Sequence, residues 1–178
     1  MTIIQENTAP RDYGCLMAYP CLRDMNKFAT FNKKLLPSHM LYEKPGDNGY
    51  GVEQEPHCTL KYGFTPDLKL QDLASILKGI KPFDINVIGL SKFENPEFDV
   101  VKFDIKPTQQ LTKLRNICDE YPNEDKYPDY KPHMTVGYVK KNTFSQIREN
   151  LNLKLRIERI VYSSSSRNNN KRYIINLR

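Results

Sequence analysis

The stretches PHCTLKYGF (56–64) and PHMTVGYV (132–139) share one pattern. Each begins with Pro, places His and Thr two positions apart, and continues to a Gly and a Tyr. The apolar run after each Pro is typical of a β-strand, in which side chains at positions i and i+2 point to the same face. Each motif is therefore expected to project one imidazole and one hydroxyl together from the start of a strand, beside a loop.

The elements around these two strands recur in a similar order: a loop, a Pro, a His-led strand, a helix and further strands. Apolar spacing predicts helices over 24–36, with Asp24 as the N-cap, over 68–79 and 107–121, and a short one from 142 or 143 to 151. Strands are predicted over 13–19, 57–64, 83–93, 98–106, 133–139, 153–164 and 172–177. This order favours an α+β or α/β class with more than one sheet, in two pseudo-symmetric lobes.

Length and composition indicate one globular domain. The chain has 178 residues, of which 39% are hydrophobic and 27% charged. Residues 1–12 are polar and are expected to be a flexible N-terminus, followed by a single two-lobed domain over 13–178. The Pro- and Gly-containing loop 37–55 is expected to be a lid or a binding edge, and the polar tract 163–172 a hairpin loop.

Charge, hydropathy and cysteines restrict the compartment and the class of ligand. The net charge of +6 suits an anionic ligand, although ordinary solubility charge explains it equally well. The sequence contains neither an apolar run of transmembrane length nor a secretory signal. The four cysteines are scattered without a CxxC pair, so reduced thiols in a cytoplasmic protein are expected, with no metal and no cofactor.

Two imidazoles and two hydroxyls that converge on one cleft suit cleavage of a phosphodiester without a metal. A neutral His removes a proton from the attacking oxygen, and a protonated His gives one to the leaving oxygen. The Thr hydroxyls donate hydrogen bonds to the non-bridging phosphate oxygens. A single strand-end His usually satisfies only a backbone group, but two Pro-preceded copies account for two of the three histidines in the chain.

The paired motifs resemble those of the two-histidine (2H) phosphoesterase superfamily, which includes LigT-like RNA ligases and cyclic phosphodiesterases. The resemblance runs from Tyr13 to the C-terminus. It implies an α+β, bilobal, pseudo-two-fold fold with antiparallel sheets lining a central cleft and helices outside. It also implies metal-independent catalysis by His57, Thr59, His133 and Thr135.

The stretches YGCLMAY, HCTLKYG and YKPHMTVGY look like those of the phage anti-CBASS proteins, which degrade cyclic oligonucleotide messengers such as 3′,3′-cGAMP. This resemblance implies a cyclic di- or oligonucleotide substrate in the cytoplasm of an infected host, with no stable nucleic acid complex and no membrane. Two other enzyme classes stay open, an RNA 2′,3′-cyclic phosphodiesterase and a 2′-5′ oligoadenylate phosphodiesterase. A non-catalytic nucleotide sponge would not need both His–Thr pairs.

Tyrosines are the expected stacking platforms for nucleobases, because the chain has 11 Tyr and no Trp. Tyr19, at the end of its strand, and Tyr130, in the loop before the second motif, are the candidates. Each is equally compatible with a structural role in the core or at the rim. Tyr62 and Tyr138 are out of phase with their His and Thr, so they are expected to pack on the far side of the sheet.

Charged residues near the motifs are candidates for substrate binding. Lys61 is in phase with His57, and Lys131 borders His133, so both are expected to neutralise phosphate charge unless they are simply solvated. In the strand 153–164, Lys154, Arg156 and Glu158 share one face. If that face lines the cleft, Glu158 accepts a hydrogen bond from a base edge and Arg156 binds phosphate.

Overall fold

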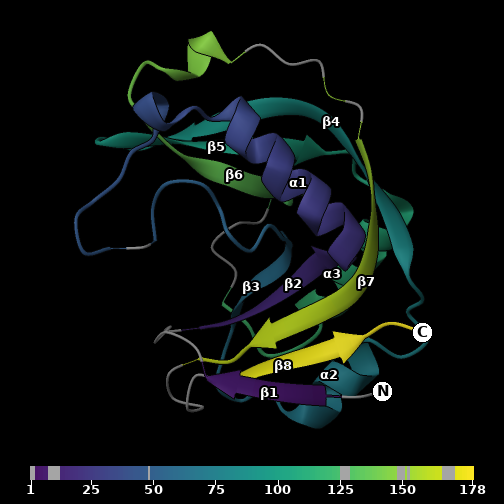
Figure 1. Cartoon of the computed structure of the whole chain (residues 1–178). Coiled ribbons are helices and arrows are strands. Elements are labelled where there is room, and N and C mark those ends of the chain that lie inside the picture. The colour runs from purple at the N-terminus through teal and green to yellow at the C-terminus, as the bar shows by residue number, and fades with distance from the viewer. Residues whose placement is uncertain are drawn as a thin grey trace.

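The two strands that carry the His–Thr motifs lie next to each other in the sheet (Figure 1). They are β3 (Cys58–Phe64) and β6 (His133–Lys140), and they are antiparallel, with Cys58 opposite Met134. The computed structural model describes residues 3–7, 13–47, 49–124, 129–147, 151, 153–165 and 171–178. Within these ranges the chain is built from antiparallel strands and a few helices, which is the predicted α+β class.

The other strands close a ring around this central pair. They are β1 (Ile3–Asn7), β2 (Gly14–Pro20), β4 (Phe83–Glu94), β5 (Phe98–Ile105), β7 (Leu153–Ser163) and β8 (Lys171–Asn176). Across the sheet the order is β1-β8-β7-β2-β3-β6-β5-β4, and the first half of β7 also pairs with β4. The long strand β7 therefore joins the edge strand β4 to β2 and β8 and closes the ring, while β1 remains at the other edge (Figure 1). The two expected sheets are continuous with each other through the β3–β6 and β4–β7 pairings.

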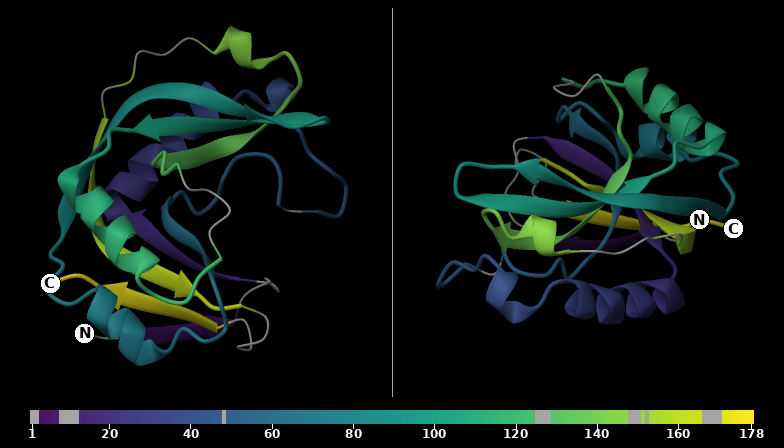
Figure 2. Two further views of the ribbon diagram at one scale, coloured as in Figure 1. Left: turned by 180° about the vertical axis from the view of Figure 1, so that it is seen from behind. Right: turned by 90° about the horizontal axis from the view of Figure 1, so that it is seen from above.

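The halves are related by chain order and by packing. In one half β3 lies beside β2 and β2 beside β7, and in the other β6 lies beside β5 and β5 beside β4. The helix α1 (Leu22–Leu35) follows β2, and α3 (Gln109–Asp119) follows β5. Figure 2 shows these helices on opposite sides of the strands. Each helix covers the other half: Phe28 of α1 lies edge-on to Phe103 of β5, and α3 packs on β3.

Local sequence explains how the helices begin and which side they bury. Thr108 caps α3, because its hydroxyl accepts a hydrogen bond from the amide of Leu111 at 3.2 Å. In α1 the expected cap is wrong: the helix begins one turn earlier, after Cys21. Asp24 is buried instead, and its carboxylate accepts a hydrogen bond from the amide of Arg156 in β7 at 2.9 Å. A third helix, α2 (Leu70–Ile76), is shorter than predicted.

Two shorter elements complete the description. A 3₁₀ turn, η1 (Ser38–Met40), follows α1, and a second, η2 (Phe144–Gln146), replaces the first part of the helix expected from 142 or 143 to 151. Residues 148–150 of that expected helix lie outside the described residues, as do residues 166–170 of the expected hairpin loop. Among the described residues, no helix is long and apolar enough to cross a membrane.

The N-terminal segment differs from the sequence prediction where the structure describes it. Residues 1–12 were expected to be flexible, but Ile3–Asn7 form β1 and pair in antiparallel register with Lys171–Ile175 of β8. The pairing extends the sheet by one edge strand beyond the expected start of the domain at residue 13. Residues 1–2 and 8–12 lie outside the described residues.

The loop 37–55, expected to be a lid or a binding edge, is docked against β6. Tyr42 donates its amide to the carbonyl of Tyr138 at 2.9 Å, and Tyr138 donates its own amide to the carbonyl of Gly51 at 2.8 Å. The amide of Glu53 bonds the carbonyl of Val136 at 2.9 Å. These bonds hold the loop as an irregular extra layer along the motif strand.

Candidate active site

The two His–Thr pairs lie on one face of the β3–β6 pair. Because Cys58 and Met134 are opposite each other, one step along each strand places Thr59 across from His133 and His57 across from Thr135. Cys58 and Met134 are fully buried on the other face, whereas all four motif side chains are half-buried. The expected convergence of two imidazoles and two hydroxyls is thus what the register produces.

Both imidazoles are held in the same way. Nδ1 of His57 lies 2.7 Å from the carbonyl oxygen of Glu55, and Nδ1 of His133 lies 2.8 Å from that of Lys131. A carbonyl only accepts, so each Nδ1 carries the hydrogen of this bond. In the neutral tautomer, Nε2 then holds the lone pair and can take up a proton. In the imidazolium, the same Nε2 can donate one.

The surroundings of His57 are an aromatic ring and an ion pair. The ring of Tyr19 stacks on the imidazole, with centroids 5.3 Å apart and planes inclined by 28°. Arg172 pairs with Glu55 at 2.8 Å and donates a hydrogen bond to the Tyr19 hydroxyl at 3.0 Å. Tyr19 is only 3% exposed. The side chain predicted to touch substrate therefore packs behind His57, since its buried ring leaves no surface for a nucleobase.

The surroundings of His133 are likewise an aromatic ring and an ion pair. The ring of Phe93 meets the imidazole edge-on at 5.0 Å, and the ammonium of Lys102 lies 4.7 Å from the centre of the Phe93 ring. Lys102 is paired with Asp104, which lies opposite His133 in the sheet. Burial lowers the pKa of His133 most, and the charges of Lys102 and His57 lower it further. His133 is thereby kept neutral to a lower pH than an ordinary histidine.

A β-bulge follows the Thr of each motif. Across β2 the register passes from Met17–Thr59 to Leu16–Lys61, and across β5 from Lys102–Thr135 to Val101–Gly137. Each bulge inserts one residue, so the alternation of faces is reset. The sequence prediction assigned each side chain to a face by alternation along an unbroken strand. This assignment is wrong for the residues that follow each bulge.

The first bulge exchanges the expected places of Lys61 and Tyr62. Lys61 is buried, 1% exposed, and forms an ion pair with Asp119 of α3, so it does not border the cleft as predicted. Tyr62 was expected on the far side, but it lines the cavity beside Thr59. Beyond the second bulge, Tyr138 packs against Tyr50 of the docked loop at 5.4 Å.

A cavity of about 640 Å³ opens beside the motifs. It includes Thr59 and His133 together with Tyr130 and Lys131, two of the residues predicted to bind substrate. The complete lining is Cys15, Thr59, Leu60, Tyr62, Phe93, Arg115, Asp129, Tyr130, Lys131 and His133. The volume and the mixture of aromatic and charged side chains are typical of a site for a small polar ligand.

Arg115 and Phe93 of this lining were not singled out in the sequence. Arg115 belongs to α3, is 6% exposed, and its guanidinium lies 5.6 Å from the Tyr130 ring centre. A signal existed, because Arg115 follows Leu114 on the apolar face of its helix, where charged residues are rare. For Phe93, at the end of its strand, no pattern in the sequence marks a neighbour of His133.

Glu158 lies away from this cavity. It is exposed in β7, at a third bulge, where the register passes from Tyr19–Arg159 to Pro20–Ile157. Arg159 takes the place opposite Tyr19, and its guanidinium lies 5.5 Å from the centre of that ring. Glu158 is thus not among the cavity residues, and Arg156 bonds Asp84 rather than lining the cavity.

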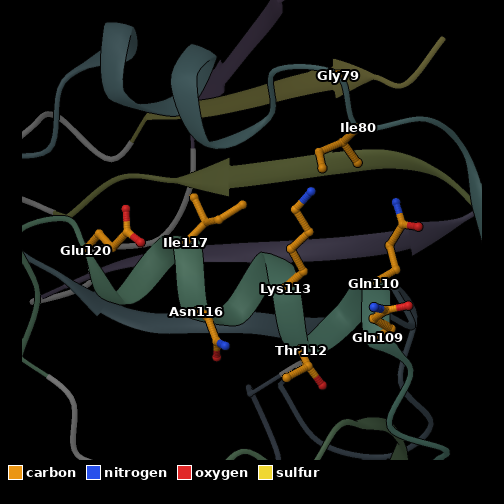
Figure 3. A pocket seen from close by; sticks show the side chains of 9 residues that line it. All are labelled: Gly79, Ile80, Gln109, Gln110, Thr112, Lys113, Asn116, Ile117 and Glu120. Carbon is orange, nitrogen blue, oxygen red and sulfur yellow. The ribbon is translucent and has the colours of Figure 1, made fainter.

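A second cavity, of about 700 Å³, lies outside α3 and lacks the chemistry of the first. Figure 3 shows that Thr112 and Asn116 project from one side of the helix, whereas Lys113 and Ile117 project toward Ile80 on the other. These side chains do not converge on one point, and none is a histidine. The motifs therefore identify the cavity beside β3 and β6 as the candidate active site.

Among the described residues, no group of three or more His, Cys, Asp or Glu side chains is placed to hold a metal ion.

A comparison with families of known proteins matches residues 41–169 to the 2′-5′ RNA ligase superfamily, and this range contains both His–Thr motifs. The match covers well over half of the chain. The protein belongs to the 2′-5′ RNA ligase (2H phosphoesterase) superfamily.

One curated relative in this superfamily is the RNA 2′,3′-cyclic phosphodiesterase of Methanothermobacter thermautotrophicus. It is 33% identical over 93 residues, which are 47% of this chain and 50% of that protein. The matched part thus spans only half the length of this curated relative.

Solved structures of the superfamily agree in fold. Escherichia coli LigT in complex with 3′-AMP superimposes with a TM-score of 0.59 at 12% identity, covering 94% of this chain and 95% of LigT. Usb1 of Kluyveromyces marxianus gives a TM-score of 0.55 at 12% identity, covering 94% and 98%. At these identities the likeness establishes the antiparallel, two-lobed α+β fold.

Proposed function

We propose that this 2H phosphoesterase is a metal-independent phosphodiesterase that cleaves the 3′–5′ bonds of cyclic di- or oligonucleotides such as 3′,3′-cGAMP. The observation that carries the proposal is the pairing of Cys58 with Met134, which brings both His–Thr couples to one face beside a cavity. In a bacterial cell this activity would remove the messenger of CBASS defence signalling.

The chemistry follows from the substrate and the four groups. A 3′–5′ bond has a free 2′-hydroxyl beside the phosphorus. One imidazole removes the proton of this hydroxyl while the other protonates the departing 5′ oxygen, leaving a 2′,3′-cyclic phosphate. In the β3–β6 pair, Thr59 lies across from His133 and Thr135 across from His57. Their hydroxyls can donate hydrogen bonds to the two non-bridging phosphate oxygens as negative charge grows there.

A second candidate is hydrolysis of an RNA 2′,3′-cyclic phosphate, favoured by the name of the Methanothermobacter relative. The same four groups serve this reaction with water as the nucleophile. The partial length of that match leaves the substrate to experiment. The third enzyme class, 2′-5′ oligoadenylate cleavage, requires the free 3′-hydroxyl to attack the adjacent phosphorus while the 5′ oxygen departs, with the substrate held in the same cavity.

The test is incubation of the protein with 3′,3′-cGAMP, an RNA ending in a 2′,3′-cyclic phosphate, and a 2′-5′ oligoadenylate, each with excess EDTA. Linear dinucleotide is the expected product. Turnover of only the RNA end or only the oligoadenylate would instead assign the corresponding activity, and binding without any product would identify a sponge.

His57→Ala and His133→Ala are each expected to lower kcat/KM for 3′,3′-cGAMP by ~10²–10⁴-fold, the usual contribution of one proton-transfer group. The matched control is His39→Ala, because His39 is exposed and lies outside the cavity. Near-normal turnover by either motif variant would remove that histidine from the mechanism, and a strict requirement for added metal would overturn the proposal.

A further inference from the structure

A tyrosine follows each His–Thr pair at the same spacing. The motif strands read HCTLKY (57–62) and HMTVGY (133–138), so Tyr62 and Tyr138 are each three positions after the Thr of their motif. In an unbroken strand this spacing would place the ring and the hydroxyl on opposite faces. The bulge that follows each Thr inserts one residue, and it thereby returns both rings to the face of the motifs.

The pairing with β5 fixes the face on which Tyr138 lies. Thr135 lies opposite Lys102. Tyr138 lies opposite Val100, which is two positions from Lys102 along β5. Because alternate side chains of a strand share a face, Tyr138 points to the same side of the sheet as Thr135, and the prediction that it packs on the far side is wrong. Two residues of a strand advance by about 7 Å, so Tyr138 is the next side chain on this face after Thr135.

Three further aromatic rings extend the surface around Tyr138. The ring centres of Tyr50 and Phe98 lie 5.4 Å and 5.7 Å from that of Tyr138, and Tyr42 lies 5.0 Å from Phe98. Tyr42 and Tyr50 belong to the docked loop, whereas Phe98 is the first residue of β5. All four residues are half-buried. We call these four residues the aromatic strip. They give the motif face an apolar surface that solvent still reaches.

The strip and the cavity lie at opposite ends of the paired motifs. Since β3 and β6 are antiparallel, the rows along the pair begin with Tyr62, continue with the two His–Thr couples, and end with Tyr138. The cavity includes Tyr62, together with Thr59 and His133. None of the four strip residues lines it. The four motif side chains therefore lie between two separate aromatic surfaces.

Resting on the function proposed above, we infer that the aromatic strip binds the second nucleoside of the substrate, while the cavity holds the nucleoside whose 2′-hydroxyl attacks. A phosphodiester carries one nucleoside on each side of its phosphorus, and the motifs have one aromatic surface on each side. Aromatic side chains bind nucleobases by stacking, and every base has a flat face for this contact. The site is thus matched to a substrate with nucleosides on both sides of the scissile bond, in preference to a single terminal nucleotide.

Two substrates, one with and one without a second nucleoside, test this assignment. Adenosine 3′-(methyl phosphate) keeps the 2′-hydroxyl and the scissile bond of 3′,3′-cGAMP, but a methyl group replaces the second nucleoside. Tyr138→Ala is expected to lower kcat/KM for 3′,3′-cGAMP by about 10–100-fold, the usual contribution of one stacked base, with most of the loss in KM. It is expected to leave kcat/KM for the methyl ester nearly unchanged, because that substrate does not reach the strip.

Further variants separate stacking from folding. Tyr138→Phe keeps the ring and is expected to match the unmodified protein on both substrates. Tyr138→Leu and Tyr50→Leu keep apolar bulk without a ring, and both are expected to show a selective loss on 3′,3′-cGAMP. The matched control is Tyr173→Ala, which removes a half-buried ring that stacks on Tyr162, outside the cavity and the strip. Its effect is expected to be equal on the two substrates. Thermal unfolding shows that each variant is folded.

The outcomes separate this inference from the proposed function. Equal losses on both substrates in Tyr138→Ala and Tyr138→Leu, or no loss on 3′,3′-cGAMP, would overturn the role of the strip while leaving the phosphodiesterase intact. No turnover of 3′,3′-cGAMP by the unmodified protein would refute the proposed function, and the inference with it.

Discussion

At the scale of single residues, the two motifs are strand-end imidazoles tied to the carbonyl two positions earlier. The Pro before each His favours an extended backbone at the residue before it, which is Glu55 in one motif and Lys131 in the other. The carbonyl of that residue accepts the hydrogen bond from Nδ1 of the imidazole. The pattern Pro-His-x-Thr is therefore enough to predict that the His and the Thr of each motif share a face. It is not enough to predict their neighbours: Tyr19, Phe93 and Arg172 come from distant parts of the chain.

The threonine hydroxyls can be tested separately from the imidazoles. Thr59→Val and Thr135→Val remove one donor each while keeping the shape of the side chain, and each is expected to lower kcat by ~10²–10³-fold if the hydroxyl donates to the charge of the transition state. Thr59→Ser and Thr135→Ser keep the hydroxyl and are expected to retain most of the rate. Steady-state kinetics on the preferred substrate measures this, and valine variants as active as the serine variants would exclude the role.

At the scale of elements, the bulge after each Thr decides what lies farther along the strand. The extra residue turns Lys61 toward Asp119 and α3 and brings Tyr62 to the cavity. In the second strand it leaves Gly137 facing the docked loop. A bulge has no simple signature in one sequence, because it depends on the register with the neighbouring strand. This is why Lys61 and Tyr62 were misplaced by alternation alone.

Gly137 is expected to be required for docking of the loop 37–55. A Cβ at this position would lie 2.7 Å from the carbonyl oxygen of Gly51 and 2.7 Å from a methyl of Leu36, so Gly137→Ala must displace backbone. We expect a loss of about 1–3 kcal/mol in the free energy of unfolding, as for overpacked cores. Gly89→Ala is the control, since its nearest atom is 3.7 Å away. Urea unfolding compares the two, and equal stabilities would show that the loop is not tightly held.

At the scale of the whole molecule, buried carboxylates join segments that are distant in sequence. Asp24 binds α1 to β7, and Asp99 binds Lys92 of β4 and Lys141 after β6. Burial by itself would raise the pKa of both, but their hydrogen bonds outweigh it, and both pKa values lie below the ordinary range.

The sign of the linkage predicts acid lability. A carboxyl whose pKa is lower in the folded state contributes stability above its unfolded pKa of about 4, and this contribution is lost as the pH falls through the folded value. The free energy of unfolding is therefore expected to fall as the pH is lowered from 5 to 2, and Asp99→Asn is expected to flatten that dependence. Urea titrations at several pH values measure it. A wild-type stability that does not change below pH 4 would contradict the linkage.

The sequence by itself determined the class of the fold, most of the helices and strands after residue 13 and the four residues of the two motifs, because helix and strand periods and a repeated tetrapeptide are local properties. Tertiary structure decided the rest. The opposition of Cys58 and Met134 makes one site of two motifs, and the bulges choose the residues around it. Each histidine then lies beside an aromatic ring and an ion pair contributed by other strands. The register of a strand and the side chains that surround it depend on how several strands pair, so no single segment of the chain encodes them.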